Sequence, residues 1–315
     1  MSISIEQFLQ ALTAGLLVGC VYGLMCVGLA FIFGIMRVIN FAQGDFMMVG
    51  MYLAIFMVVN LSTVTLFGPV APFIAALATA PVMFIAGYAL HRFLIARITG
   101  MRAVSELEAH QSQLVLTLGI ALILQNGALI LLGSAPVSTI TPLSSAAWEI
   151  PLLYDDMAAV FLNKARTIDA AIAIVIALAF FWLMGHTRIG KSLRGAADNP
   201  EAALYTGIDV DRAHHIAFGL GTAIAGIAGG LIVLYYPVQP FVGIDFIIIM
   251  YAGVVLGGMG SVNGAFWGGM TIGLVQQLAT LVLPLQLQNA AIFVVFLMLL
   301  FFRPQGFFGR STERA

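Results

Sequence analysis

Charged side chains are scarce in this chain. Asp, Glu, Lys and Arg make up 9% of its 315 residues, against about 25% in an average soluble domain. Apolar residues make up 61%, and the mean hydropathy is +1.05. This composition excludes a water-soluble globule, because such a fold could not bury that much apolar surface. The net charge of −1 also excludes the basic field that nucleic-acid binding requires.

Cysteine is almost absent as well. Cys20 and Cys26 are the only two, and their spacing within one apolar run fits neither a disulfide framework nor a zinc site. We expect both to serve packing. No spacing of His, Cys, Asp and Glu indicates a metal site, and no nucleophile has a plausible base and orienting group. The sequence therefore predicts no metal, no cofactor and no catalytic residue, so an enzyme is not expected.

The uncharged stretches are long enough to cross a membrane. About 20 apolar residues span a bilayer as a helix, and helix is the default there because backbone groups find no water. The sequence predicts spans at about 8–34, 46–67, 69–90, 114–133, 169–185, 215–236, 246–258, 264–283 and 289–302. The expected fold class is an all-α polytopic membrane protein with eight or nine crossings, in which residues 1–315 form a single transmembrane domain.

The basic residues predict which side each connection faces. They gather at 92–102, at 188–212 and in the tail after residue 302. A nine-span count places these three segments on one side, and leaves only Lys164 and Arg166 on the other. Because basic loops stay in the cytoplasm, we expect a cytoplasmic segment at about 186–214 and an outer connection at about 134–168.

Ionisable residues inside the bilayer are nearly missing. Each costs at least ~2.5–3.5 kcal/mol and usually marks function. Only Asp45 and Asp245 are candidates, and both lie at a span boundary. An ion-coupled carrier normally needs a buried ionisable group, and a channel needs a selectivity ring. We therefore expect the energy for any uphill transport to come from outside this chain.

Two glycine-rich polar segments interrupt the apolar pattern, one at 34–45 and one at 257–264. The stretch 246–258 gives only about 20 Å of helix, which is the length of a half-helix rather than a span. Paired interruptions are typical of discontinuous helices along a substrate pathway and of an inverted repeat; the alternative is two ordinary loops. The residues expected along the pathway are Asn40, Phe41, Gln43, Gly44, Gly257, Gly258, Gly260, Ser261, Asn263 and Gly264.

Glycines recur at intervals of four in several spans, as in Gly15, Gly19 and Gly23. Small residues at this spacing let helix backbones approach closely in lipid. The pattern predicts tight packing between helices of this chain or against a second subunit.

The cytoplasmic segment at about 186–214 contains a predicted short helix, at 198–207, with both ends capped. Asp198 or Asn199 can cap its start, Pro200 suits its first position, and Gly207 suits the left-handed residue after its end. A helix barely two turns long is marginal alone, so we expect it to dock on a partner; the alternative is an ordinary surface helix. The residues assigned to it are Asp198, Asn199, Pro200, Glu201, Ala202, Ala203 and Gly207.

Together these elements resemble the permease subunits of bacterial ABC importers for branched-chain amino acids, of the LivH type. The resemblance runs in order along nearly the whole chain. It rests on FGIMRVINFAQGDF (33–46), GKSLRGAADNPEAA (190–203), GIDVDR (207–212), VVLGGMGSVNGA (254–265) and RPQGFFGR (303–310). Two positions depart from the pattern: Asn263 stands where Pro is expected, and Gln43 where His is common.

The resemblance implies a multi-pass protein of the bacterial inner membrane, in contact with lipid, that imports branched-chain or other hydrophobic amino acids. It implies three kinds of partner: a second permease, as a heterodimer; two ATPase subunits, with 198–207 as the coupling helix; and a periplasmic substrate-binding protein. From its acidic residues we expect the outer connection to contribute to docking that binding protein; the alternative is a passive linker. Relatives that carry urea, amides or other small molecules leave another substrate open. A secondary carrier or channel is the alternative of a different class.

Overall fold

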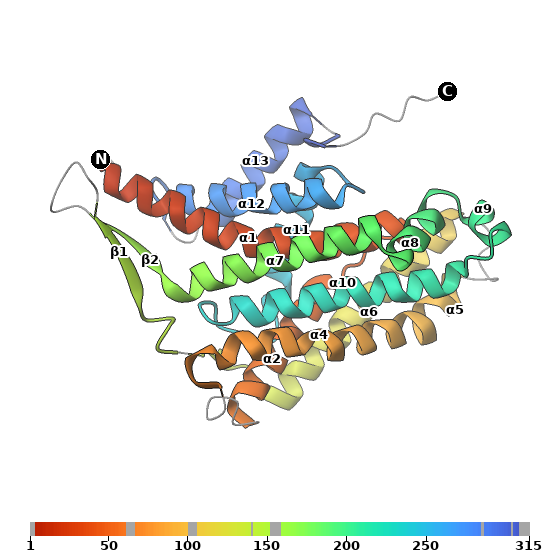
Figure 1. Cartoon of the computed structure of the whole chain (residues 1–315), viewed down its shortest axis with the longest axis horizontal. Coiled ribbons are helices and arrows are strands. Elements are labelled where there is room, and N and C mark those ends of the chain that lie inside the picture. Colours follow the sequence, from red (N-terminus) through yellow and green to blue (C-terminus); the bar gives the residue numbers. More distant parts are fainter. Residues whose placement is uncertain are drawn as a thin grey trace.

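A computed structural model describes residues 4–60, 67–99, 106–139, 141–151, 159–284, 287–303 and 305–308. Figure 1 shows long helices lying side by side along the longest axis of the molecule. One end carries the N-terminus and a small hairpin of strands β1 and β2, and we call it the hairpin end. The opposite end carries helices α8 and α9, and we call it the α9 end.

The elements follow one another along the chain with few long connections. The N-terminal half contains α1 (Ile5–Met36), α2 (Gln43–Asn60), a 3-10 turn (Gly68–Val70), α4 (Ala71–Leu90), a π-helical turn (His91–Ile95), α5 (Ala96–Thr99) and α6 (Glu106–Leu132). The remainder contains β1 (Ala147–Pro151), β2 (Ala159–Asn163), α7 (Lys164–His186), α8 (Arg188–Asp198), α9 (Pro200–Tyr205), α10 (Val210–Ile232), α11 (Val242–Gly257), α12 (Val262–Ala279) and α13 (Gln288–Phe302).

Each of the nine predicted spans coincides with a helix. Within the described residues, six helical stretches are long and apolar enough to cross a membrane, and α11 and α13 are shorter apolar helices. The remaining predicted span, 264–283, is α12. The protein is thus an all-α polytopic membrane protein, as predicted. The largest boundary difference is at α6, which begins at Glu106 rather than at residue 114.

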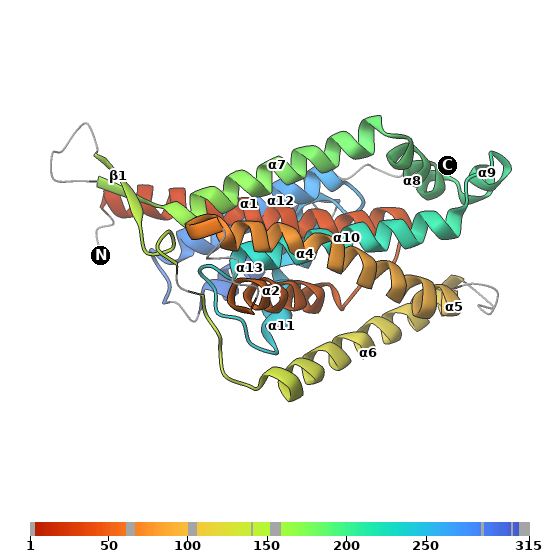
Figure 2. The same cartoon turned by 60° about the horizontal axis from the view of Figure 1, so that its bottom comes forward.

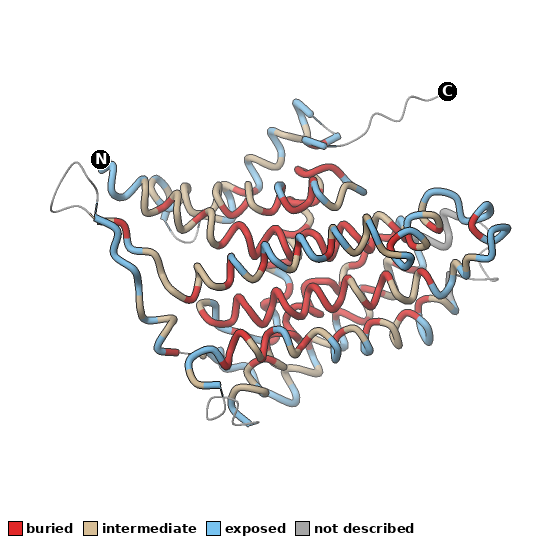
Figure 3. The backbone as a smooth tube through the Cα atoms, in the orientation of Figure 1, coloured by how far each residue is buried: buried red, intermediate tan, exposed pale blue. Residues whose placement is uncertain are grey.

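Helices α1 and α10 form the centre of the bundle, and most of their residues are buried (Figure 3). Glycines bring their neighbours close, as predicted. A Cβ added to Gly19 of α1 would lie 2.7 Å from the carbonyl oxygen of Met270 in α12, and one added to Gly50 of α2 would lie 2.5 Å from Gly226 in α10. The glycine intervals therefore serve packing within this chain.

The helices pack in the pattern of an inverted repeat. Helix α1 packs most extensively on α12, and α10 packs most extensively on α4, while α1 and α10 contact each other. Helix α1 runs from the hairpin end to the α9 end and α10 runs back (Figure 1). The triplet α1, α2 and α4 thus corresponds to α10, α11 and α12. The break at 37–42 then corresponds to 233–241, and not to 257–264, with which the sequence pattern had paired it.

The outer connection predicted at 134–168 contains a structure that the sequence did not predict. Strands β1 and β2 form an antiparallel hairpin in which Ala147 is opposite Asn163 and Pro151 is opposite Ala159. The side chain of Gln10 ties this hairpin to α1, because it both donates to and accepts from the backbone of Phe161, at 2.8 and 2.9 Å. Residues 152–158, with Asp155 and Asp156, lie outside the described part of the chain.

Candidate functional site

The first interrupted segment turns back into the bundle after α1. Arg37 ends α1 with a left-handed backbone (φ 54°), and α2 starts only six residues later. The side chains of Asn40 and Gln43 are fully buried. Gln43 Nε2 donates a 3.1 Å hydrogen bond to the carbonyl of Gly221, which lies at the middle of α10. Helix α2 therefore begins deep inside the bundle, as expected for a discontinuous helix.

The buried amides of this segment satisfy one another. Asn40 Nδ2 donates to Gln43 Oε1 at 3.0 Å, and Asn40 Oδ1 accepts from the backbone N–H of Ala42 at 3.1 Å. Buried polar groups are costly unless they are hydrogen-bonded, so this small network holds the chain in its non-helical path. It also places uncharged donors and acceptors at the level where the two halves of the molecule meet.

The start of α2 meets the start of α11 there. A Cβ on Gly44 would overlap the carbonyl oxygen of Gly243, and a Cβ on Gly243 would lie 2.6 Å from Asp45 Oδ1. Asp45 itself is 2% exposed and its Oδ1 accepts a 2.9 Å hydrogen bond from Gln125 Nε2 of α6. The Phe41 ring lies 5.7 Å from the ring of Tyr251 in α11. Residues 40–45, Gly243 and Tyr251 form what we call the central cluster, and Gln125 of α6 contacts it.

The second interrupted segment has a different environment. Gly258 (φ 100°) and Gly260 (φ 88°) have backbone conformations that side chains with a Cβ rarely adopt. Ser261 caps α12, because its hydroxyl accepts a 3.1 Å hydrogen bond from Gly264 N. Gly257 and Gly264 pack backbone against backbone, since a Cβ on either would overlap the other. This segment is a tight reversal between α11 and α12.

A cavity of about 820 Å³ borders this reversal. Gly260, Ser261 and Asn263 line one side of it, and Arg194 and Asp198 of α8 line another. The structure does not bring Ser261 and Asn263 together with Asn40 and Gln43, which lie in the central cluster. The predicted pathway residues therefore occupy two places, one in the middle of the bundle and one at this cavity.

The predicted docking helix is present and protrudes from the α9 end (Figure 1). Asn199 caps α9 by accepting a 3.0 Å hydrogen bond from Ala202 N, Pro200 is its first residue, and Gly207 has φ 83°. These capping roles are as predicted, except that Asp198 is the last residue of α8. Ala203 is buried, while Tyr205 is 91% exposed and Leu204 is also exposed, so α9 presents an uncovered apolar face.

Two buried groups were missed by the sequence reasoning. Asp169 is fully buried in α7, and neither of its carboxylate oxygens has a hydrogen-bond partner in the described part of the chain. Its position at the predicted edge of a span concealed it. His91 is buried too, and its Nδ1 lies 2.7 Å from Nδ1 of His215. Within the described residues no group of three or more His, Cys, Asp or Glu is placed to hold a metal ion.

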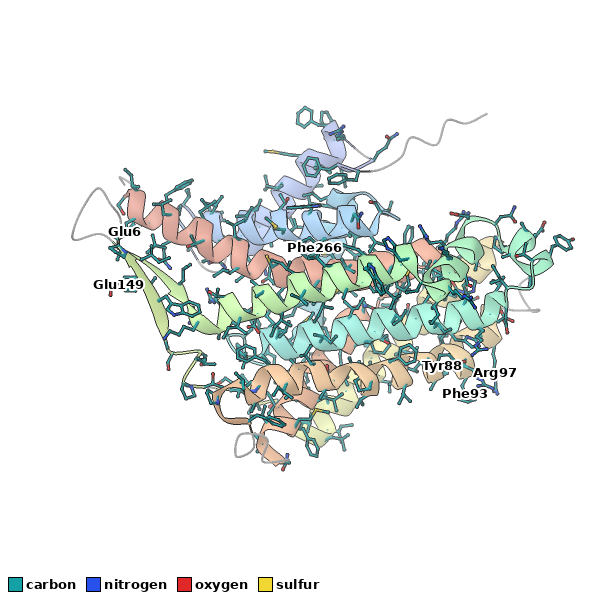
Figure 4. The ribbon with its side chains drawn as sticks, viewed as in Figure 1. Glu6, Tyr88, Phe93, Arg97, Glu149 and Phe266 are labelled. Carbon is teal, nitrogen blue, oxygen red and sulfur yellow. The ribbon has the colours of Figure 1, made fainter. Side chains whose placement is uncertain are left out.

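Basic side chains distinguish the two ends, whereas acidic ones occur at both, because Asp198, Glu201 and Asp209 also lie at the α9 end. Glu6 and Glu149 lie at the hairpin end, and Arg97 lies near the other end (Figure 4). Arg92, Arg188, Lys191, Arg194 and Arg212 belong to the connections of that second end.

Comparison with known proteins identifies relatives along nearly the full chain. The family described as "Branched-chain amino acid transport system / permease component" matches residues 11–302. The high-affinity branched-chain amino acid transport system permease protein LivH of Escherichia coli (strain K12) is 28% identical, with 98% of each chain covered. The corresponding permease protein BraD of Pseudomonas aeruginosa is 26% identical, with 97% of each chain covered. No solved structure matches this chain.

Proposed function

The chain belongs to the family of branched-chain amino acid transport permeases, and from this membership we propose that it forms the membrane pathway of an ATP-driven importer for branched-chain or other hydrophobic amino acids. It is a multi-pass inner-membrane transport subunit and not an enzyme. The proposal adds that it works as a heterodimer with a second permease, that two separate ATPase subunits supply the energy, and that a periplasmic binding protein delivers the ligand.

The observation that carries the proposal is the uncovered face of α9. A six-residue helix is too short to be stable alone, and its outward side carries Tyr205, which is 91% exposed, beside an exposed Leu204. Buried Ala203 fixes the helix on the bundle, so its outward face is held ready for a partner. An ATPase subunit that received this face could transmit its closure to α8 and α10, the helices on either side.

The charge of the two ends supports the orientation that this coupling needs. Three basic residues, Arg188, Lys191 and Arg194, lie in α8, directly before α9. Two basic residues, Lys164 and Arg166, lie at the start of α7, at the hairpin end. By the positive-inside rule the α9 end is cytoplasmic. The hairpin end then faces the periplasm, where β1 and β2 can contribute to docking of the binding protein.

The pathway is proposed to use the central cluster and the cavity beside Asn263. Both offer amides, hydroxyls and backbone groups to a ligand. These groups can form hydrogen bonds to a zwitterion without holding it as tightly as opposite charges would. Because the cluster is closed in this structure, passage requires the α2 and α11 starts to separate. The same geometry suits other small polar ligands, so the choice of amino acid rests on the family resemblance.

Asp169 favours a second candidate function. A fully buried carboxylate in a transmembrane helix, without a hydrogen-bond partner among the residues that the structure describes, is the kind of group that binds a coupling ion or a proton in a secondary carrier. In that case α9 would be an ordinary surface helix and no ATPase subunit would be needed.

Purification of the tagged chain from its native membrane tests the proposal. We expect a second permease and ATPase subunits to co-purify in mild detergent and to remain bound during size-exclusion chromatography. A variant with Tyr205→Ala is expected to retain the second permease and to lose the ATPase subunits. If the wild-type chain purifies alone from every detergent in which it stays folded, the importer proposal is contradicted.

A further inference from the structure

Helix α6 is attached to the molecule in an unusual way. Figure 2 shows it standing apart from the other helices for most of its length. Its exposed residues include the apolar Val115, Leu122 and Ile123, whereas the buried positions are Gln113, Thr117, Ile120, Ala121 and Gln125. The side of the helix toward the protein thus carries three polar residues among apolar ones, as a helix that faces lipid on one side and a hydrophilic space on the other would.

The buried polar residues form a stripe along the helix. Gln113, Thr117 and Gln125 are separated by four and eight residues, so they lie on one face. At 1.5 Å per residue the stripe is about 18 Å long, which is more than half of a hydrocarbon core of about 30 Å. Ala121 continues the same face between Thr117 and Gln125 and is also buried.

This stripe contacts the central cluster through hydrogen bonds. Gln125 Nε2 donates to Asp45 Oδ1 at 2.9 Å, and the backbone N–H of Phe41 donates to Thr117 Oγ1 at 3.4 Å. Beside them the buried hydroxyl of Tyr251 has no hydrogen-bond partner in the described residues, although the Tyr251 ring packs near Phe41. The Tyr251 hydroxyl can both donate and accept a hydrogen bond, so it adds an unused polar group near the Phe41 end of the stripe.

Helix α6 is attached without the close glycine contacts of the central helices. Those helices meet through glycines whose added Cβ atoms would collide with the next backbone, but nothing lies within 4 Å of a Cβ on Gly119 or Gly127 of α6. In lipid, small residues give close helix contacts and polar side chains give hydrogen bonds between helices. Besides the apolar contacts of Ile120 and Ala121 with the core, α6 is held by hydrogen bonds, which can be exchanged for bonds to a polar ligand.

We propose that the polar stripe of α6 forms one wall of the ligand path, and that a zwitterionic amino acid with an apolar side chain passes between it and the central cluster. This inference rests on the proposed function. As the ligand passes, the Asp45 carboxylate accepts hydrogen bonds from its ammonium group. The Gln125 amide and the Phe41 backbone N–H donate to its carboxylate, and the rings of Phe41 and Tyr251 contact its side chain. The two hydrogen bonds that join α6 to Phe41 and to Asp45 are broken meanwhile.

Thiol accessibility during turnover tests this wall. In a background with Cys20→Ala and Cys26→Ala, the Ala121→Cys variant places a thiol within the stripe, and the Leu122→Cys variant places one on the exposed apolar face as a control. The probe is the charged, membrane-impermeant reagent 2-sulfonatoethyl methanethiosulfonate. We expect the Ala121→Cys complex to react severalfold faster with ATP and amino-acid-loaded binding protein than without them. The Leu122→Cys complex is expected to stay inert in both conditions. A thiol at 121 that is equally slow in both conditions overturns the inference.

A matched pair of neighbouring amides supplies the second measurement. Gln125→Leu removes the amide facing Asp45, while Asn126→Leu removes an exposed amide whose Nδ2 bonds only within α6, to Leu122 O at 2.8 Å. We expect Gln125→Leu to lower amino acid uptake about tenfold, as loss of one hydrogen bond to a charged group would. ATP hydrolysis stimulated by loaded binding protein should continue, and Asn126→Leu should leave both activities unchanged.

The outcomes separate this inference from the function on which it rests. If wild-type complexes take up amino acids and Gln125→Leu transports at the wild-type rate, the wall assignment is wrong and the importer remains. An equal fall in uptake, stimulated hydrolysis and abundance would show that Gln125 only stabilises the fold, and would also refute the wall. If wild-type complexes take up no amino acid, the proposed function fails, and this inference fails with it.

Discussion

Gly44 and Gly243 are each the second residue of a helix that begins inside the bundle, and their backbones lie in contact. A Cβ on Gly243 would lie 2.9 Å from the backbone nitrogen of Asp45. Each glycine is followed closely by an Asp-Phe pair, Asp45-Phe46 in α2 and Asp245-Phe246 in α11. The Asp-Phe pair begins one residue after Gly44 but two residues after Gly243, so the two halves meet through the first turns of α2 and α11 and not through identical positions.

This contact predicts a large cost for the smallest substitution. Gly44→Ala would force a methyl group into the carbonyl of Gly243, and overpacking of this kind costs about 1–3 kcal/mol. We expect a lower thermal unfolding midpoint and less folded protein in detergent, measured by fluorescence-detected size-exclusion chromatography after heating. Gly127→Ala is the control, because open space surrounds that position. Equal stability of the two variants would contradict the contact.

The sequence could predict most of the helices, because uncharged apolar runs have few alternatives in lipid. It also predicted the caps of α9, since Asn199, Pro200 and Gly207 act through local geometry. It paired the wrong interruptions, because the glycines of 257–264 are conspicuous whereas 233–241 lacks a glycine-rich pattern. The bond from Gln125 to Asp45 spans 80 positions, and nothing local to either residue indicates it. Asp169 was missed because a carboxylate near a span edge can lie in water or protein with the same sequence around it.

Gly207 provides a test of α9 that separates strain from steric conflict. Its φ is 83° and nothing lies within 4 Å of an added Cβ, so a substitution acts through backbone conformation alone. A β-branched residue resists this left-handed conformation, whereas Asn tolerates it. We expect Gly207→Val to abolish ATP hydrolysis stimulated by loaded binding protein, and Gly207→Asn to retain most of it. Both should insert in the membrane at normal abundance; full stimulation in the Val variant would remove α9 from the coupling mechanism.

Tyr205 is expected to anchor the ATPase subunits. An exposed aromatic residue that becomes buried in an interface often contributes roughly 2 kcal/mol, which is about thirtyfold in the dissociation constant. Tyr205→Ala should weaken ATPase binding by that factor, as measured by titrating purified ATPase into nanodisc-embedded permease. Phe56→Ala, an exposed aromatic residue of α2 far from α9, should bind as the wild type does. Unchanged affinity in the Tyr205 variant would mean that the ATPase docks elsewhere.

The two predicted pathway sites should differ in their access to water. Asn263 is exposed beside the cavity, so Asn263→Cys should react with a charged thiol reagent in the resting state. Asn40 is fully buried, and Asn40→Cys should react only while the complex hydrolyses ATP with loaded binding protein. Both variants carry Cys20→Ala and Cys26→Ala. If neither thiol reacts in any state, these residues do not line the pathway.

The source of energy for uptake distinguishes an ATP-driven importer from an ion-coupled carrier. The complex with its partner permease and ATPase subunits is reconstituted in liposomes, and accumulation of radiolabelled leucine is measured after loaded binding protein is added outside. We expect accumulation that requires ATP inside the liposomes and persists when ionophores abolish all ion gradients. Accumulation that is independent of ATP and is abolished by the ionophores would contradict the importer proposal. It would also identify Asp169 as the site to examine in an ion-coupled carrier.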